Sequence, residues 1–296
     1  MSDLRLSTLA LLLFALPIAL PTASAQAKQD ASPQSSASTT DTKKPLAAWP
    51  ALQAKDRDRA IVLTGQLKKD DEAVRAAARS EMLAMGAGAA PILFQKVGDA
   101  EKELALNEEL YLVFDEMLTE EHRALMAEQA KKKKIELRKY LLRRLCLMAD
   151  PELKSAFEPF RKESDEQTLL YATLGLAARK DKDALMQLLE ITRSDWASHV
   201  ELVSKALPFA RSGECALALA ERMANNSNEV KAAGLRLLRY VATENEKPII
   251  KTYLAAEDHG VVKEAVNVMR VMNGMEPMEK LSAFDVIGMA KEWQSK

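Results

Sequence analysis

The composition of this 296-residue chain favours helices and excludes a strongly charged protein that binds nucleic acid or a membrane surface. Hydrophobic residues make up 48% and charged residues 29%, whereas aromatic residues make up only 5%, with 10 Gly and 11 Pro. Since good helix formers dominate and the net charge is -1, we expect an almost wholly helical chain, long enough for a sizeable core, without a field that attracts polyanions.

The N-terminal segment has the pattern of a secretory signal peptide. An unbroken apolar run from Leu9 to Leu16 follows Arg5, and the small residues Ala23-Ser24-Ala25 form a cleavage signal before Gln26. We predict a signal peptide over residues 1–25 and secretion of the mature chain into a bacterial periplasm, with no transmembrane segment after cleavage. An uncleaved anchor is the alternative, although the apolar run is short for a membrane span.

The next segment, residues 26–45, is rich in Ser, Thr, Ala, Gln and Lys and contains almost no large apolar side chain. Such a stretch buries too little surface to offset its ordering entropy. We therefore predict a flexible linker here and a folded domain over residues 46–296.

The rest of the chain repeats a pair of helices about every 31 residues. The apolar residues that begin one helix of each pair are Val74, Leu110, Leu137, Leu169, Val200, Val230 and Val262. The partner helices follow the same step at Ile61, Ile92, Leu125, Leu153, Leu185, Ala216, Ile249 and Met278. A fixed period of this length with two helices per unit is typical of an α-solenoid. We predict an all-α fold, a right-handed α-solenoid of about seven helical-hairpin repeats with a C-terminal capping helix.

One stretch, LKKDDEAVRAAARSEMLAMGAGAAPIL at residues 67–93, resembles a HEAT repeat, as found in exported bacterial proteins of the HEAT-like α-solenoid family. The likeness rests on Asp70-Asp71, Val74-Arg75, Ala77-Ala78, Gly86 and Pro91. The Val-Arg feature recurs as Leu137-Arg138, Val230-Lys231 and Val262-Lys263, and it lapses at Leu110-Tyr111, Leu169-Leu170 and Val200-Glu201. The resemblance implies that Arg75, Arg138, Lys231 and Lys263 have a structural role, in a ladder of charges with Asp in the preceding turn.

Motifs for catalysis, metal binding or phosphate binding are not evident in the sequence. The three histidines, His122, His199 and His259, fall in three different predicted units. Stacked units are roughly 8–10 Å apart, which is too far for three ligands to share one metal ion. We expect no catalytic residue, no metal and no cofactor.

A basic patch at residues 131–144 is the one conspicuous group of candidate binding residues. It comprises Lys131, Lys132, Lys133, Lys134, Arg138, Lys139, Arg143 and Arg144, and it follows an acidic segment from Asp99 to Glu121. Two interpretations stay open. Either the patch and the acidic segment neutralise one another across the stack, or the patch docks an anionic partner. Nucleic acid is disfavoured, because aromatic residues are not interleaved with the bases.

The two cysteines lie three predicted units apart, too far for the 7 Å or so that a disulfide allows between Cα atoms. We expect two free thiols, with Cys146 buried and Cys215 more accessible.

These features predict a non-catalytic exported repeat protein that binds another protein as a scaffold or adaptor, and not an enzyme. The alternative is a groove binder of an anionic ligand or polymer through the basic patch. A lyase-type enzyme is the third and weakest hypothesis, suggested by the resemblance because some bilin lyases share this type of repeat.

Overall fold

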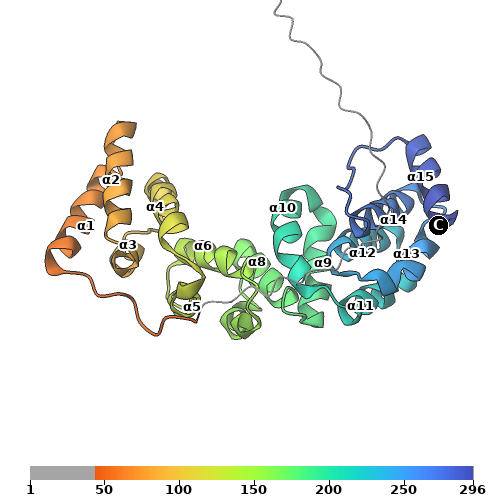
Figure 1. The fold of residues 1–296 in the computed structure, drawn as a ribbon, viewed down its shortest axis with the longest axis horizontal. Coiled ribbons are helices and arrows are strands. Elements are labelled where there is room, and N and C mark those ends of the chain that lie inside the picture. The colour runs from red at the N-terminus through yellow and green to blue at the C-terminus, as the bar shows by residue number, and fades with distance from the viewer. Residues whose placement is uncertain (1–43, 296) are drawn as a thin grey trace, which may run out of the picture. The chain divides into compact units, whose positions relative to one another are not determined.

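The structure is a computed structural model that describes residues 44–295, and helices follow one another through almost all of this range (Figure 1). The predicted signal peptide and residues 26–43 of the predicted linker lie outside the described residues, so both stay predictions. Between residues 44 and 295 there is no strand, and none of the helices combines the length and the apolar character needed to cross a membrane.

Fifteen α-helices make up the described part of the chain and confirm the predicted all-α class. They are α1 (Ala54–Gln66), α2 (Glu72–Ala84), α3 (Ala90–Phe94), α4 (Leu104–Met117), α5 (Arg123–Ala130), α6 (Ile135–Cys146), α7 (Lys154–Phe157), α8 (Glu166–Ala177), α9 (Lys182–Ser194), α10 (Trp196–Ala206), α11 (Gly213–Ala224), α12 (Asn228–Val241), α13 (Lys247–Tyr253), α14 (His259–Met272) and α15 (Ala283–Ser295). Each even-numbered helix contains one of the seven predicted repeat positions. Each repeat position that was predicted from the sequence therefore corresponds to a helix in the structure.

Short polar side chains start these helices and glycines end two of them. The carboxylates of Asp71, Asp165 and Asp258 accept hydrogen bonds from backbone N–H groups of the first turns of α2, α8 and α14, at 2.8, 2.8 and 2.9 Å. Gly86 and Gly274 follow α2 and α14 with φ of 70° and 73°, a conformation that favours glycine after a helix end. These signals divide the chain into helices short enough to pack side by side.

Packing between successive even-numbered helices builds the core. Helix α2 contacts α4, α6 contacts α8, and α12 contacts α14. Between α4 and α6 the contact is aromatic, because the rings of Tyr111 and Tyr140 stack with centroids 4.4 Å apart beside Phe114. The buried apolar residues of all units form one cluster, as expected where each hairpin buries its faces against its neighbours.

The fifth unit departs from this regular stack. Helix α12 packs against α9 and against the short helical turn η6 (Leu207–Ala210) that follows α10. Gly234 of α12 leaves room for Met223 of α11, whose sulfur would lie 2.3 Å from an added Cβ, and Leu189 of α9 lies beside it at ordinary van der Waals distance. The start of α10 meets α12, where the ring of Trp196 lies near the guanidinium groups of Arg236 and Arg239.

The predicted partner helix at Met278 is wrong. Helix α14 ends before Gly274, and residues 275–282 are irregular before α15 begins at Ala283. The side chain of Asn267 holds this segment, since its Oδ1 accepts from the Met278 N–H at 2.7 Å and its Nδ2 donates to the Met278 carbonyl at 3.1 Å. The predicted capping helix is present as α15, which packs against α14.

Two of the four basic residues at the repeat positions bind the backbone of the preceding turn. Arg75 donates to the carbonyls of Lys69 and Asp70 at 2.7 and 2.9 Å. Arg138 donates to the carbonyls of Ala130 and Lys132, both at 3.2 Å. The structural role is as the resemblance implies, but these residues bind peptide oxygens where an Asp side chain was expected.

Both cysteines are free and buried. Burial raises the pKa of the Cys146 thiol to about 12, so that thiol is a small hydrophobic group at neutral pH. The expectation that Cys215 is accessible is wrong, because its position on α11 turns the side chain into the core with no exposed surface.

The segment before α1 is fixed by an aromatic stack. The Trp49 ring lies parallel to the imidazole of His122 with centroids 5.6 Å apart, and edge-on to Phe94. His122 is only 7% exposed, and its Nδ1 accepts a hydrogen bond from the Thr119 N–H at 3.1 Å. This acceptor role requires an unprotonated Nδ1.

Acidification below neutral pH should therefore weaken this region. Burial lowers the pKa of His122, so the unfolded chain takes up a proton as the pH falls through about 6.5, before the folded chain does. The stabilisation is complete above that pH and is lost as the pH falls toward the folded-state pKa. Thermal unfolding from about pH 7 to 5.5 should show a smaller loss for His122→Phe, which keeps an aromatic ring beside Trp49. Equal losses in both proteins would contradict this role.

Candidate functional site

Five of the eight residues in the basic patch have partners within the chain. Four of them bind carboxylates. Lys131 lies 2.5 Å from Glu128, Arg138 lies 3.0 Å from Glu163, and Lys139 lies 3.0 and 3.1 Å from Glu136 and Asp165. Lys134 donates to the carbonyls of Gln95 and Val97, both at 2.7 Å, and Arg144 binds Asp115 at 2.5 Å and the Leu118 carbonyl at 2.7 Å. Lys131 pairs within the end of α5, whereas the other four side chains link neighbouring elements.

The neutralising carboxylates come mostly from outside the acidic segment. Asp115 binds Arg144, and Asp99 accepts from the backbone N–H of Glu136 at 2.9 Å. The other acids that pair with the patch lie on α5 and α6 or in the turn before α8. The charges of the basic patch are thus neutralised within the stack, as the first interpretation predicts, but the acidic segment from Asp99 to Glu121 supplies only some of the carboxylates.

Arg143 differs from the other patch residues, because it is exposed and lines a cavity of about 260 Å³. Lys132 and Lys133 are also exposed but do not line that cavity. We call the cavity the α6–α8–α10 crevice. Helix α6 supplies Arg143 and Leu147, α8 supplies Gln167, Leu170 and Tyr171, and α10 supplies Ser198, His199, Glu201, Leu202 and Lys205.

The crevice combines an apolar wall with polar groups and a net positive charge. Leu147, Leu170 and Leu202 give the apolar surface. Glu201 accepts from Lys205 at 2.7 Å, and that hydrogen bond lowers the pKa of Glu201, so the two charges compensate one another. In the part of the chain that the structure describes, Arg143 has no carboxylate within ion-pair distance. Its charge is available to a ligand.

The hydroxyl of Tyr171 adds a hydrogen-bond donor. Burial raises the pKa of Tyr171, so the phenol keeps its proton at neutral pH. The amide of Gln167 and the hydroxyl of Ser198 also line the crevice and are able to donate. A negatively charged group beside Arg143 would thus meet one cation and several neutral donors.

A signal for this site exists in the sequence, in the lapses of the repeat pattern. Leu170 and Glu201 occupy the positions where the Val-Arg feature places a basic residue, and both line the crevice. Without an arginine that binds the preceding turn, these two units leave the space open. The lapses alone do not reveal the site, because α6, α8 and α10 meet only in the folded chain.

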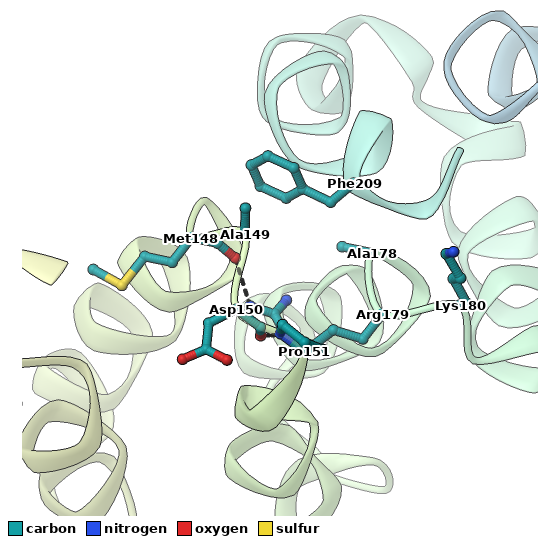
Figure 2. A pocket seen from close by; sticks show the side chains of 8 residues that line it. All are labelled: Met148, Ala149, Asp150, Pro151, Ala178, Arg179, Lys180 and Phe209. Atoms are coloured by element: carbon teal, nitrogen blue, oxygen red, sulfur yellow. Dashed lines mark hydrogen bonds between the residues drawn. The ribbon is translucent and has the colours of Figure 1, made fainter. Parts of the chain in front are cut away.

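Figure 2 shows a second cavity of about 330 Å³, the Arg179 pocket, where the turns after α6 and α8 meet η6. Arg179 donates to the carbonyl of Asp150 at 3.0 Å, of Gly175 at 2.8 Å, of Leu145 at 3.1 Å and of Met148 at 2.7 Å. Burial lowers the pKa of Arg179 to about 10. Its charge compensates the negative ends of α6 and α8, so it is committed to the fold.

The other groups of the Arg179 pocket support this interpretation. The Asp150 carboxylate is directed away from Arg179 in Figure 2 and pairs with the buried Arg123. Phe209, which is 37% exposed, and Ala149 line the mouth. Lys180 lies apart from the other lining side chains (Figure 2). The pocket is therefore largely an apolar slot, and the α6–α8–α10 crevice is the stronger candidate site.

The histidines stay apart in the structure. His122 is stacked on Trp49, His199 lies in the crevice, and His259 is exposed at the start of α14. Over residues 44–295, no group of three or more His, Cys, Asp or Glu side chains is placed to hold a metal ion. The expected absence of a metal and of a cofactor stays a prediction.

The described residues define the class, an all-helical chain of stacked hairpins of the α-solenoid kind. No protein-family model matches the sequence, and no curated protein sequence matches it. Among solved structures, human deoxyhypusine hydroxylase in complex with glycerol matches with a TM-score of 0.33 and 15% sequence identity. The match covers 81% of this chain and 96% of the other.

This comparison corrects one prediction. The chain was expected to be a non-catalytic scaffold, whereas this matching structure is that of an enzyme, a hydroxylase. The prediction of a non-catalytic scaffold is therefore withdrawn. A likeness at this level of identity assigns no activity to this chain either, so its function has to be argued from its own site.

Proposed function

We propose that this protein binds a small organic anion in the α6–α8–α10 crevice, with Arg143 as the cation that recognises it. The observation that carries the proposal is that Arg143 lines a cavity while most of its basic neighbours are paired. The leucine wall favours a ligand with a compact aliphatic body, and the volume of about 260 Å³ limits that ligand to a small molecule. A branched aliphatic carboxylate has this chemistry.

We also propose that the chain is an exported protein of HEAT-like repeats. The contacts of Arg75 and Arg138 with their preceding turns support the repeat type. Support for export comes from the sequence of residues 1–25 alone.

Binding of isocaproate and of its neutral amide, isocaproamide, tests the function by calorimetry. The carboxylate should bind the wild-type protein about tenfold more tightly than the amide, because a charge-assisted hydrogen bond is worth about 1.5–3 kcal/mol. Arg143→Glu should abolish this preference, and added salt should reduce it.

Lys132→Glu is the matched control, because it reverses an exposed charge of the same patch outside the crevice. This variant should bind both compounds as the wild type does. Equal affinity of the wild-type protein for carboxylate and amide would remove the proposal. An Arg143→Glu variant that is folded and still prefers the carboxylate would also remove it.

A further inference from the structure

A third cavity, of about 430 Å³, lies between α13, α14 and α15 at the C-terminal end of the stack. We infer that this cavity is a second ligand site, for an organic anion with a flat apolar body. It is lined by Lys247, Pro248, Lys251, Met269, Asn273 and Trp293. We call it the Trp293 cavity.

The walls of the Trp293 cavity suit a planar apolar group. The indole of Trp293, the thioether of Met269 and the ring of Pro248 come from three different helices and face one space. Indole presents a large rigid apolar face, and methionine adapts its shape to an aromatic neighbour. Trp293 and Met269 also belong to or pack on the apolar core, so the walls are held in place.

The side chains that line this cavity carry a net positive charge. Lys247 and Lys251 lie one turn apart on α13, and none of the six lining residues is acidic. By contrast, the crevice includes Glu201 and the Arg179 pocket includes Asp150. The amine of Lys247 binds Glu244 at 2.5 Å. Within residues 44–295, Lys251 has no carboxylate at ion-pair distance, so its amine is the group that meets the anion.

The remaining polar side chain of the cavity, Asn273, would hold one edge of the ligand through a hydrogen bond. Asn273 donates from Nδ2 to the Met269 carbonyl at 2.6 Å, and its Oδ1 remains able to accept a hydrogen bond. A ligand that carries an anionic group and a flat ring would place the anion at Lys251 and the ring against Trp293. An anion without a ring would contact only Lys251, and a ring without an anion would contact only Trp293.

Anilinonaphthalene sulfonate, a flat apolar ring system with one anionic group, is the probe that tests the site. Its binding should quench the emission of Trp293 by energy transfer. Trp293→Phe keeps a flat ring but removes that donor, so it should bind the probe while losing most of the quenching. Quenching that survives Trp293→Phe would place the probe elsewhere and overturn the inference.

The charge requirement is tested with Lys251→Glu and with the uncharged compound anilinonaphthalene. Lys251→Glu should weaken sulfonate binding about tenfold and leave binding of the neutral compound unchanged. Lys280→Glu, an exposed charge reversal outside the cavity, is the control and should change neither. Circular dichroism shows that each variant is folded. A folded Lys251→Glu variant that binds the sulfonate as the wild type does would overturn the inference. Arg143→Glu should leave this site intact, so its outcome is independent of the crevice.

Discussion

Replacing Glu264 with alanine should lower the free energy of unfolding by about 3–5 kcal/mol, because it leaves a buried guanidinium without its main counter-charge. Arg239 has no exposed surface and Glu264 is 2% exposed, and the two side chains form an ion pair between α12 and α14. Arg239 also binds Glu279 at 3.0 Å, but that carboxylate is 52% exposed and compensates less. Urea unfolding followed by circular dichroism measures the loss.

Glu190 provides a matched control for this experiment. Like Glu264 it pairs with two arginines, Arg222 at 2.9 Å and Arg193 at 3.3 Å, but the side chain of Glu190 is 39% exposed and those of the two arginines are 46% and 43% exposed. Glu190→Ala should therefore cost much less, since water screens the pairs. The double variant Arg239→Met with Glu264→Leu should recover most of the stability, because it removes both buried charges. Equal losses from Glu264→Ala and Glu190→Ala would show that burial does not decide the effect.

Adding one methyl group at Gly175 should destabilise the fold by about 1–3 kcal/mol. A Cβ atom there would lie 2.4 Å from the ring of Phe157, far inside van der Waals contact. Phe157 is fully buried, and the Arg179 guanidinium lies 4.8 Å from its centroid on one face. The ring therefore has little room to move. The melting temperature of Gly175→Ala is the measurement.

Substitutions at two other glycines distinguish the effect of steric crowding on stability from the effect of helix propensity. At Gly234 the added Cβ would meet the sulfur of Met223 at 2.3 Å, and this flexible side chain is able to shift, so Gly234→Ala should cost less than Gly175→Ala. Gly288 lies within α15 and faces open space, so Gly288→Ala should stabilise that helix by about 0.5–1 kcal/mol. Any other order of the three variants would contradict the packing described here.

The helical repeat was predictable from the sequence because it rests on local rules. Apolar residues recur with the period of a hairpin, and caps such as Asp71 and Asp258 mark the helix starts. The departures from the regular repeat depend on contacts between segments that are distant in the sequence. The segment around Met278 is apolar enough for a helix, but its backbone is bound by Asn267. The packing of α12 against α9 and η6 likewise joins segments that are distant in the sequence, which no periodicity reveals.

The candidate site was less predictable than the fold. The basic patch stands out in the sequence as a run of charge, yet Arg138, Lys139 and Arg144 find partners 25 to 29 residues away or in adjacent turns. The sequence does not distinguish these paired basic residues from Arg143, which has no ion pair among the described residues; the folded structure does. For the same reason, the Trp293 cavity had no sequence signal, since its residues are drawn from three helices.

Repeat proteins commonly change length during evolution by gaining or losing whole units, because each unit offers its neighbour an equivalent surface. The packing of α12 removes that freedom at one boundary of this chain. Since α12 rests on α9 and η6 and meets α10 mainly through Trp196, deleting α9 to η6 as a block would bring α8 against a surface shaped for other residues. The two halves on either side of this boundary are therefore not interchangeable modules, and duplication or loss of units is expected to be tolerated only within each half.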